Sequence, residues 1–216
     1  MHILISNQTE DIIMKNILVI NTSLNNEHGN SNKLTELFTQ RWQQVENIRV
    51  VEQNLTTLNL PHLSADEMQA WSIAPADRNQ SQKDLANHSD QLIAELKLAD
   101  HVILGMPMYN FGVPSTFKTW IDRVARAGIT FSYTEQGPKG LLEGKKVTIL
   151  AARGGMYAGT PKDSQSQYLK DVFAFLGLSD IEFIYAEGLA MGEDGAAKAW
   201  KSVEQRIEDI LPKLAA

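Results

Sequence analysis

The fold is decided by the stretch Val102-Ile103-Leu104-Gly105-Met106-Pro107-Met108-Tyr109-Asn110-Phe111-Gly112-Val113-Pro114. It opens with an apolar run that does not alternate, which is typical of a parallel strand buried on both faces. The residues that follow, from Ser115 to Val124, carry apolar side chains at helical spacing. The segment from Pro107 to Pro114 is therefore a loop at the carboxyl end of a central strand, where open α/β sheets bind their ligands.

The side chains of this loop suit a flat ligand with an aromatic face and polar edges. Two prolines stiffen the loop, and Gly112 allows its backbone to come close to a ligand. Packing beneath a loop would account equally well for Met108 and Phe111. It accounts less well for Asn110, whose amide we expect to be partly buried and to offer a donor and an acceptor to a ring edge.

Apolar strands and amphipathic helices alternate along the rest of the chain. We expect strands over residues 17–20, 48–53, 102–106, 147–152 and 181–186. We expect helices from near residue 31 and over residues 65–71, 82–98, 115–124, 163–176 and 196–214. Residues 135–140 are rich in turn formers. Strands and helices therefore follow one another along the chain, and we expect no region that consists of strands alone. This order predicts an α/β fold: a flavodoxin-like, doubly wound, five-stranded parallel sheet in the order 2-1-3-4-5 with helices on both faces.

A single domain accounts for residues 14–216, because no linker or internal repeat interrupts this alternation. Residues 1–13 lack a basic start and a continuous apolar run, so they are not a signal peptide. We expect them to be a dispensable appendage without chemistry, because the first strand follows Met14 directly.

Composition excludes several classes of protein. The 216-residue chain has a net charge of −6, which leaves no basic footprint for nucleic acid. The absence of cysteine excludes disulfides, thiolate nucleophiles and cysteine-bound zinc, and it is compatible with the cytoplasmic location that we expect. No apolar run approaches the length of a membrane span. The five histidines lack metal-ligand spacing, so we expect no metal.

The loop after the first strand, from Thr22 to Asn32, can hold a phosphate group. It leads into a helix start, where free N–H groups and the positive end of the helix dipole attract an anion without the help of a lysine. A plain Asn/Ser N-cap would explain the same residues. The loop matches neither the dinucleotide nor the triphosphate glycine fingerprint, so a phosphate monoester is the better candidate.

A third loop, Arg153-Gly154-Gly155-Met156-Tyr157, follows the fourth strand. Its adjacent glycines would let backbone N–H groups approach a ligand, and Arg153 could offset negative charge, although a flexible turn would look the same. In the expected topology the three loops converge on one crevice. No Ser-His-Asp or paired-carboxylate pattern stands out, and we expect a structural role for Glu187. A cofactor is therefore expected to carry the reaction.

At these residues the sequence resembles the FMN-dependent NADH:azoreductases of the flavodoxin-like quinone reductase superfamily. The resemblance covers nearly everything from Met14 onward, and the segments that carry it are 107–111, 124–131, 133–135, 137–138, 153–155 and 186–188. It implies a homodimer with one FMN per subunit and active sites at the interface. It also implies NADH, with NADPH as the alternative donor, and transfer of two electrons to quinones and azo compounds by a ping-pong mechanism.

The resemblance also implies roles for individual residues. The FMN phosphate would be held by Ser23, Gly29, Asn30 and Ser31. The flavin ring would be held by Pro107, Met108, Tyr109, Asn110 and Phe111, with Arg153, Gly154 and Gly155 at its pyrimidine edge. The substrate pocket would be shaped by Tyr133, Tyr157 and Phe175.

Three positions depart from the family pattern. Gly29 and Ala152 stand where serine is common, which removes hydroxyl contacts to FMN, and Tyr157 stands where some members have histidine. Phe173 and Phe175 point about 200° apart on a helix, so one ring should meet a partner surface. The resemblance assigns that role to Phe175, beside the flavin of the other subunit.

Two other functions remain open. A non-catalytic flavodoxin would carry single electrons, but flavodoxins are usually more acidic, and the long excursion from Leu58 to Ser81 suits a dimeric reductase better. A flavin-free NAD-dependent dehydrogenase would need the glycine fingerprint that the first loop lacks. Oxidation of NADH with menadione by the purified protein alone would distinguish the reductase from the electron carrier.

Overall fold

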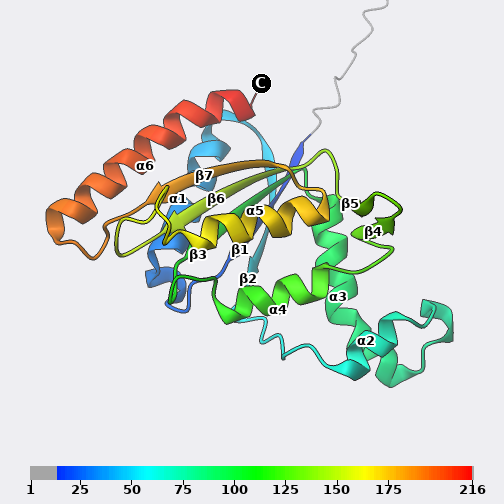
Figure 1. Ribbon diagram of the computed structural model, residues 1–216. Coiled ribbons are helices and arrows are strands. Elements are labelled where there is room, and N and C mark those ends of the chain that lie inside the picture. The colour runs from blue at the N-terminus through cyan, green and yellow to red at the C-terminus, as the bar shows by residue number, and fades with distance from the viewer. Residues whose placement is uncertain (1–13, 216) are drawn as a thin grey trace, which may run out of the picture.

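The computed structural model describes residues 14–215 and contains a five-stranded parallel sheet between two layers of helices (Figure 1). The strands are β1 (Lys15–Asn21), β2 (Ile48–Asn54), β3 (His101–Pro107), β6 (Lys146–Ala152) and β7 (Asp180–Ala186). They lie in the order β2-β1-β3-β6-β7, which confirms the predicted order 2-1-3-4-5.

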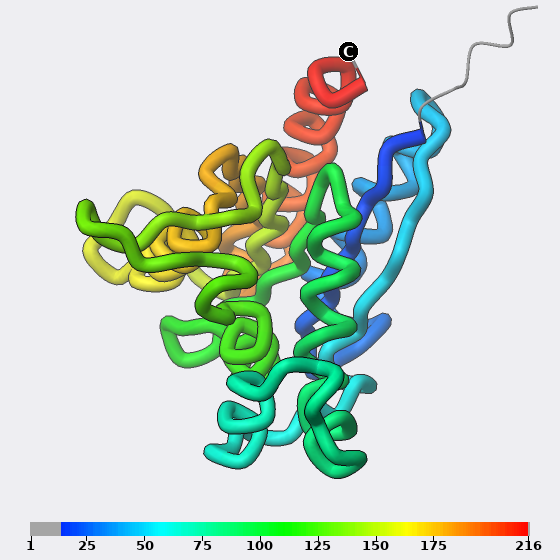
Figure 2. The backbone as a smooth tube through the Cα atoms, turned by 90° about the vertical axis from the view of Figure 1, so that its right-hand side faces the viewer, coloured from blue at the N-terminus to red at the C-terminus, as the bar shows by residue number. Residues whose placement is uncertain are grey.

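Helices cover both faces of the sheet, as predicted. On one face lie α1 (Asn30–Val45) and α6 (Glu193–Leu214). On the other lie α3 (Gln80–Leu98), α4 (Ser115–Val124) and α5 (Ser164–Leu176). The short α2 (Ala65–Trp71) packs beside α3, and Figure 2 shows this segment at the bottom of the molecule. Two single 3-10 turns, η1 (Asn26–His28) and η2 (Pro75–Asp77), complete the helical elements of the described chain.

Strand β3 is buried over its whole length, as its apolar run predicts. Its side chains alternate between the two layers, so that Leu104 and Met106 join the core beneath α3, α4 and α5, while Ile103 joins the core beneath α1 and α6. The central strand therefore anchors both helical layers at once.

The prediction that no region consists of strands alone was wrong. Residues 128–140 contain an antiparallel hairpin made of β4 (Phe131–Thr134) and β5 (Gly137–Gly140). These strands are too short for a clear alternation of apolar and polar residues. Contacts made far along the chain hold them instead: Phe131 is 8% exposed, and the chain after the hairpin bonds the end of α5 through Leu142 N and Leu176 O at 3.0 Å.

A buried ion pair holds α2 against α4. Arg123 Nη2 lies 2.7 Å from Glu67 Oε2, and the two side chains are 0% and 3% exposed. Removing one partner of such a pair strands the other charge away from water, which is strongly destabilising. This pair lies outside the three predicted ligand loops.

The predicted appendage, residues 1–13, lies outside the described residues. Within residues 14–215 no helix combines the length and the apolar character needed to cross a bilayer. Over the same range, no three His, Cys, Asp or Glu side chains are grouped so that they could hold a metal ion.

His101 gives the fold a pH-dependent stability. Its Nε2 lies 2.8 Å from Thr148 Oγ1, and its ring packs edge-on against Trp42. Burial, with Lys146 and Lys15 nearby, lowers the pKa of His101 from 6.5 to about 3. Between these two pH values His101 binds a proton in the unfolded chain but not in the folded chain. The free energy of unfolding therefore falls as pH drops from about 6.5 towards 3.

Replacement of this imidazole should flatten the pH dependence of stability. Between pH 6 and 4 the wild-type free energy of unfolding should fall more steeply than that of His101→Gln, by up to about 1.4 kcal/mol per pH unit. Urea titrations at several pH values measure both slopes. Parallel slopes would mean that His101 is not held neutral in the folded chain.

Candidate active site

Three loops meet at the carboxyl ends of β1, β3 and β6, as the topology predicts. Thr22 Oγ1 donates to Gly105 O at 2.6 Å, Leu24 N to the Tyr109 hydroxyl at 3.2 Å, and Met108 N to Ala152 O at 3.1 Å. Between the loops lies a crevice of about 210 Å³. Its lining residues are Ser23, Asn25, Gly29, Asn30, Ser31, Pro107, Met108, Tyr109, Ala152, Arg153, Gly154, Leu189 and Ala190.

The first of these loops ends at the N-terminus of α1. Gly29 is the N-cap and accepts a bond from Lys33 N at 3.0 Å, and the first turn of the helix carries no acidic residue. A Cβ at Gly29 would stand 2.0 Å from Ser23 Oγ and 2.6 Å from its Cβ. The absence of a side chain at position 29 therefore lets Ser23 pack against the helix start, which leaves positive backbone dipoles at this wall of the crevice.

Residues 109–112 of the second loop form a tight turn, here called the aromatic turn. Tyr109 and Gly112 exchange two backbone hydrogen bonds, of 3.2 and 2.9 Å. Asn110 and Phe111 between them have φ values of 50° and 65°, as in a type I′ turn. Asparagine tolerates this conformation, but for phenylalanine it is strained.

The burial predicted for Asn110 was wrong. Asn110 is exposed at the tip of the aromatic turn, so within this chain its amide faces outward. The positive φ values fall on Asn110 and Phe111, whereas that of Gly112 is not positive. The turn therefore presents Phe111, 52% exposed, at its outer surface.

The first turn of α5 fixes the aromatic turn from behind. Ser164 Oγ donates to Phe111 O at 2.6 Å. Gln165 Nε2 donates to both Pro107 O and Gly112 O at 2.9 Å. Because Gln165 is buried, these bonds hold the strained turn against a rigid helix end.

The third loop pairs with the chain that follows β7. Leu189 N donates to Arg153 O at 3.1 Å, and Ala190 N donates to Gly154 O at 3.0 Å. Leu189 and Ala190 line the crevice although the sequence did not predict them as site residues. Their only signal was their place just after the last strand, at the same edge of the sheet as the other loops.

The side chain of Arg153 turns away from the crevice into the protein. It is 0% exposed, with Nη2 2.9 Å from Asp163 Oδ1 and Nη1 3.1 Å from Glu187 Oε1. Nη2 also donates to Ser166 Oγ at 2.8 Å, and the guanidinium lies 4.8 Å over the ring of Tyr185. These contacts do not support the prediction that this charge offsets charge on a ligand, because protein carboxylates already take it up. We call these five residues the arginine cluster.

The carboxylates of the arginine cluster are structural, as expected for Glu187. Glu187 Oε1 accepts Tyr157 N at 2.8 Å and Ala158 N at 2.9 Å as well as the guanidinium. Burial alone would raise the pKa of Asp163, but hydrogen bonds from Arg153 and Ser166 lower that pKa below its usual value. Asp163 therefore stays ionised as the N-cap of α5.

A larger hollow of about 650 Å³ runs along α1 and β2. None of its lining residues comes from the aromatic turn or from the loop 153–157. The smaller crevice is the one in which a helix N-terminus, glycine backbone and an aromatic loop face one space, so we take it as the candidate site.

The chain is similar to proteins of one family over most of its length. A family model described as a flavodoxin-like fold matches residues 15–211. The FMN-dependent NADH:quinone oxidoreductase of Pseudoalteromonas atlantica is 54% identical over 199 residues, which are 92% of this chain and 98% of that protein. That of Alteromonas mediterranea is 47% identical over 197 residues, covering 91% of this chain and 98% of that protein. The chain belongs to this family.

A solved structure agrees with the fold. The azoreductase from Bacillus anthracis superposes with a TM-score of 0.84 at 28% identity, covering 93% of this chain and 100% of that chain. The predicted flavodoxin-like architecture and the resemblance are thereby confirmed.

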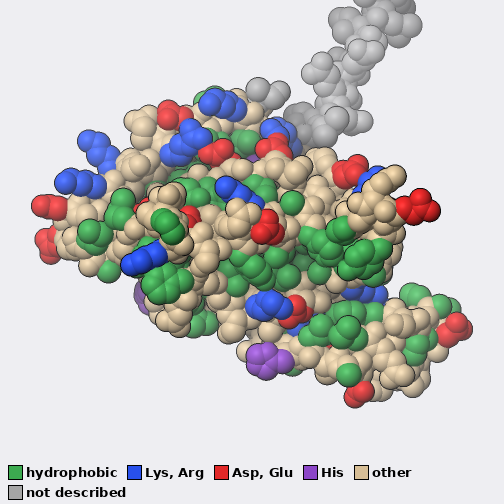
Figure 3. Space-filling view, viewed as in Figure 1, with side chains coloured by type: hydrophobic (Ala, Val, Ile, Leu, Met, Phe, Trp, Pro, Cys, Tyr) green, Lys and Arg blue, Asp and Glu red, His purple; other side chains and the backbone are tan. Residues whose placement is uncertain are grey.

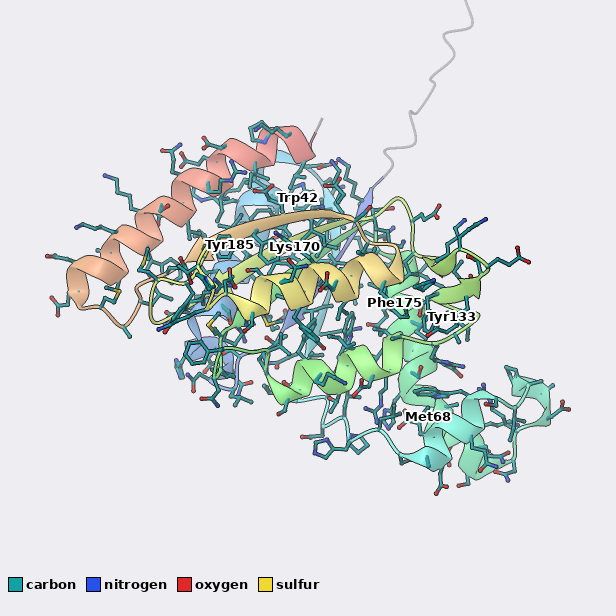
Figure 4. The ribbon with its side chains drawn as sticks, viewed as in Figure 1. Trp42, Met68, Tyr133, Lys170, Phe175 and Tyr185 are labelled. Carbon is teal, nitrogen blue, oxygen red and sulfur yellow. The ribbon has the colours of Figure 1, made fainter. Side chains whose placement is uncertain are left out.

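The three aromatic residues predicted to shape a substrate pocket lie in two places. Tyr157 lies in the third loop, and its ring is 5.7 Å from that of Phe111. Tyr133 and Phe175 lie together at the other end of α5, each packed against Phe131 (Figure 4). Phe175 is about 16 Å along the helix from the end that holds the aromatic turn. This chain therefore does not close its own crevice with Tyr133 and Phe175.

The strain at Phe111 predicts an unusual order of variant stabilities. Phe111→Gly should be more stable than Phe111→Ala by about 1 kcal/mol, because only glycine adopts a positive φ freely. At the neighbouring Val113, which has no positive φ, glycine should be less stable than alanine by about 0.5–1 kcal/mol. Denaturant midpoints of the four variants test this, and glycine being the less stable at both positions would contradict it.

Proposed function

We propose that this protein is an FMN-dependent oxidoreductase that transfers two electrons from NADH to quinones and cleaves azo bonds to amines. The proposal rests on the crevice, in which the N-terminus of α1, the Gly154 backbone and Tyr109 of the aromatic turn face one space. The family relatives named FMN-dependent NADH:quinone oxidoreductase support the same conclusion.

The wall formed by α1 fits the phosphate of FMN. Its first turn carries no carboxylate, and the backbone N–H groups of Asn30 and Ser31 open the helix without intrahelical partners. A monophosphate at this point needs no lysine, because the helix dipole supplies the positive potential. Gly29 fits the same role, since it lets Ser23 lie against the helix start.

The other walls fit a flat ring. The Met108 and Tyr109 side chains provide an apolar face next to the Gly154 backbone, which can come close to polar ring atoms. Gly155 is constrained by its neighbour, because a Cβ there would stand 2.9 Å from the ring of Tyr157. Asn110, exposed at the turn, is free to meet a ring edge or a second protein surface.

FMN, when bound, would supply the acceptance and release of two electrons in the form of a hydride, which none of these side chains can provide. The chain's own residues bind and orient it, and the apolar walls exclude water. Among the described residues that line the crevice there is no His, Asp or Glu. The protons that accompany reduction of the acceptor are therefore expected from solvent, and an azo compound must pass through two rounds to give two amines.

A second copy of the chain is proposed to complete the site. The crevice, at about 210 Å³, is smaller than the ~300–1,000 Å³ of most small-molecule pockets. Tyr133 is 75% exposed beside Phe175, and Figure 3 shows hydrophobic side chains gathered on this face around the β4–β5 hairpin. In a symmetric dimer these rings would lie over the flavin held by the other subunit, so that each site draws on both chains.

Residues 1–13 are proposed to be dispensable for this activity. The family match begins at residue 15. The match to the relative from Pseudoalteromonas atlantica includes 98% of that protein but only 92% of this chain. A chain that starts at Met14 should therefore retain cofactor and turnover.

The purified protein should be yellow and should oxidise NADH with menadione without any protein partner. Mass spectrometry of the ligand released by heat should give FMN, since the crevice offers a monophosphate site. Asn30→Glu, which puts a carboxylate at the phosphate end of α1, should lose both flavin and turnover while keeping its helix content. Recovery of FAD, or activity that needs an added electron carrier, would contradict the proposal.

Phe175→Ala should raise the KM for the quinone while FMN content and the dimer, measured by light scattering, stay as in the wild type. Donor and acceptor would use one pocket in turn, so double-reciprocal plots over both substrates should be parallel. Phe173→Ala is the matched control: its ring is fully buried, and its loss should lower stability by about 3–5 kcal/mol. Intersecting lines would reject the shared pocket, and a fully active monomer would reject the interface.

A further inference from the structure

We infer that Arg153 is a positioning residue whose guanidinium fixes the spacing between the aromatic turn and the segment 153–158 on opposite sides of the crevice. The proposed function does not require this role of Arg153. The inference rests on the proposed function only where the test measures the KM for the quinone.

The charge of Arg153 is balanced within the protein. The arginine cluster contains one guanidinium and the two carboxylates of Asp163 and Glu187, so it has no positive charge to spare. The guanidinium is 0% exposed, and the Nε atom is buried without a partner among the described residues. A guanidinium that bound a ligand would face the crevice, but the side chain of Arg153 is fully buried and its backbone faces the crevice.

The two carboxylates of the arginine cluster belong to different walls of the crevice. Glu187 receives Tyr157 N and Ala158 N, so it fixes the outer part of the third loop. Asp163 caps α5, and the next two residues of that helix, Ser164 and Gln165, hold the aromatic turn by three bonds. One guanidinium thus joins both segments, whose rings of Phe111 and Tyr157 lie 5.7 Å apart.

Among the side chains, only arginine has the shape to make all these contacts at once. Its planar fork reaches two carboxylates from separate nitrogens while its face lies over the ring of Tyr185. Tyr185 in turn contacts Ser166 through its hydroxyl at 3.0 Å. A lysine ammonium would keep the charge but could not hold both carboxylates and the ring in one geometry.

The test separates position from charge. In Arg153→Lys, hydrogen exchange at the amides of Tyr157 and Ala158, measured without FMN, should speed up by about tenfold or more as their acceptor is released. The KM for the quinone should rise with little change in kcat. Arg153→Gln should behave like Arg153→Lys. Rescue by lysine, with wild-type exchange and KM, would overturn the inference in favour of a charge role.

Glu187 provides a second pair of variants if replacement of Arg153 prevents folding. Glu187→Gln keeps an acceptor oxygen for the two amides and should change their exchange by less than about threefold, whereas Glu187→Ala should release them. Equal exchange in these two variants would contradict the inferred link.

Arg123→Lys is the matched control, because it loosens an equally buried arginine–carboxylate pair outside the crevice. It should lower the melting temperature but leave both amides and the KM unchanged. If it alters them as Arg153→Lys does, the effect is general destabilisation and the inference fails. The exchange result needs neither flavin nor NADH, so failure of the proposed enzymatic function would show separately, as an FMN-free, inactive wild type.

Discussion

The structure depends on the hydrogen bonds that β3 makes to both of its neighbours. Pairing with β1 brings Asn21 level with Gly105, and pairing with β6 brings Pro107 level with Ala152. Three loops that lie far apart in the sequence therefore start at one height on one edge of the sheet. Since the side chains of β3 alternate between two cores, a slip of one residue would move each of them into the opposite core. The crevice is a consequence of that register.

A second set of contacts turns this meeting of loops into a site of fixed shape. The first turn of α5 holds the carbonyl groups of the aromatic turn, and the arginine cluster ties the same turn of α5 to the opposite wall. The backbone of Phe111 is kept in a conformation that phenylalanine does not favour. Strain of this kind persists only where the surroundings determine the conformation, and here buried side chains do so.

The sequence predicts the parts of this protein that local pattern determines. The apolar runs located all five parallel strands. Pro61 and Pro75 bracket the helix predicted over residues 65–71, and Gly177 follows the last residue of α5. The convergence of the three loops followed from topology alone. Of the predicted cofactor residues, most line the crevice, and Asn110, Phe111 and Gly155 stand just outside that lining.

The rest depends on partners that are distant along the chain. The β4–β5 hairpin is held by the end of α5, so its short strands carry little pattern of their own. The exposure of Asn110 and the inward direction of Arg153 are decided by turn geometry and by carboxylates 10 and 34 residues away. The sequence shows that these side chains are able to bind a ligand. Only the contacts show that the guanidinium of Arg153 is bound by carboxylates of the protein.

We propose that each active site combines the crevice of one chain with Tyr133 and Phe175 of another, and dimers formed from two different variants test this proposal. Asn30→Glu chains would lack the phosphate site, and Phe175→Ala chains would lack the ring offered to the partner. After subunit exchange of equal amounts, each mixed dimer should contain one intact site. Turnover at low quinone concentration should then approach about one quarter of the wild-type value. Turnover that never exceeds the sum of the two separate variants would show that a single chain builds the whole site.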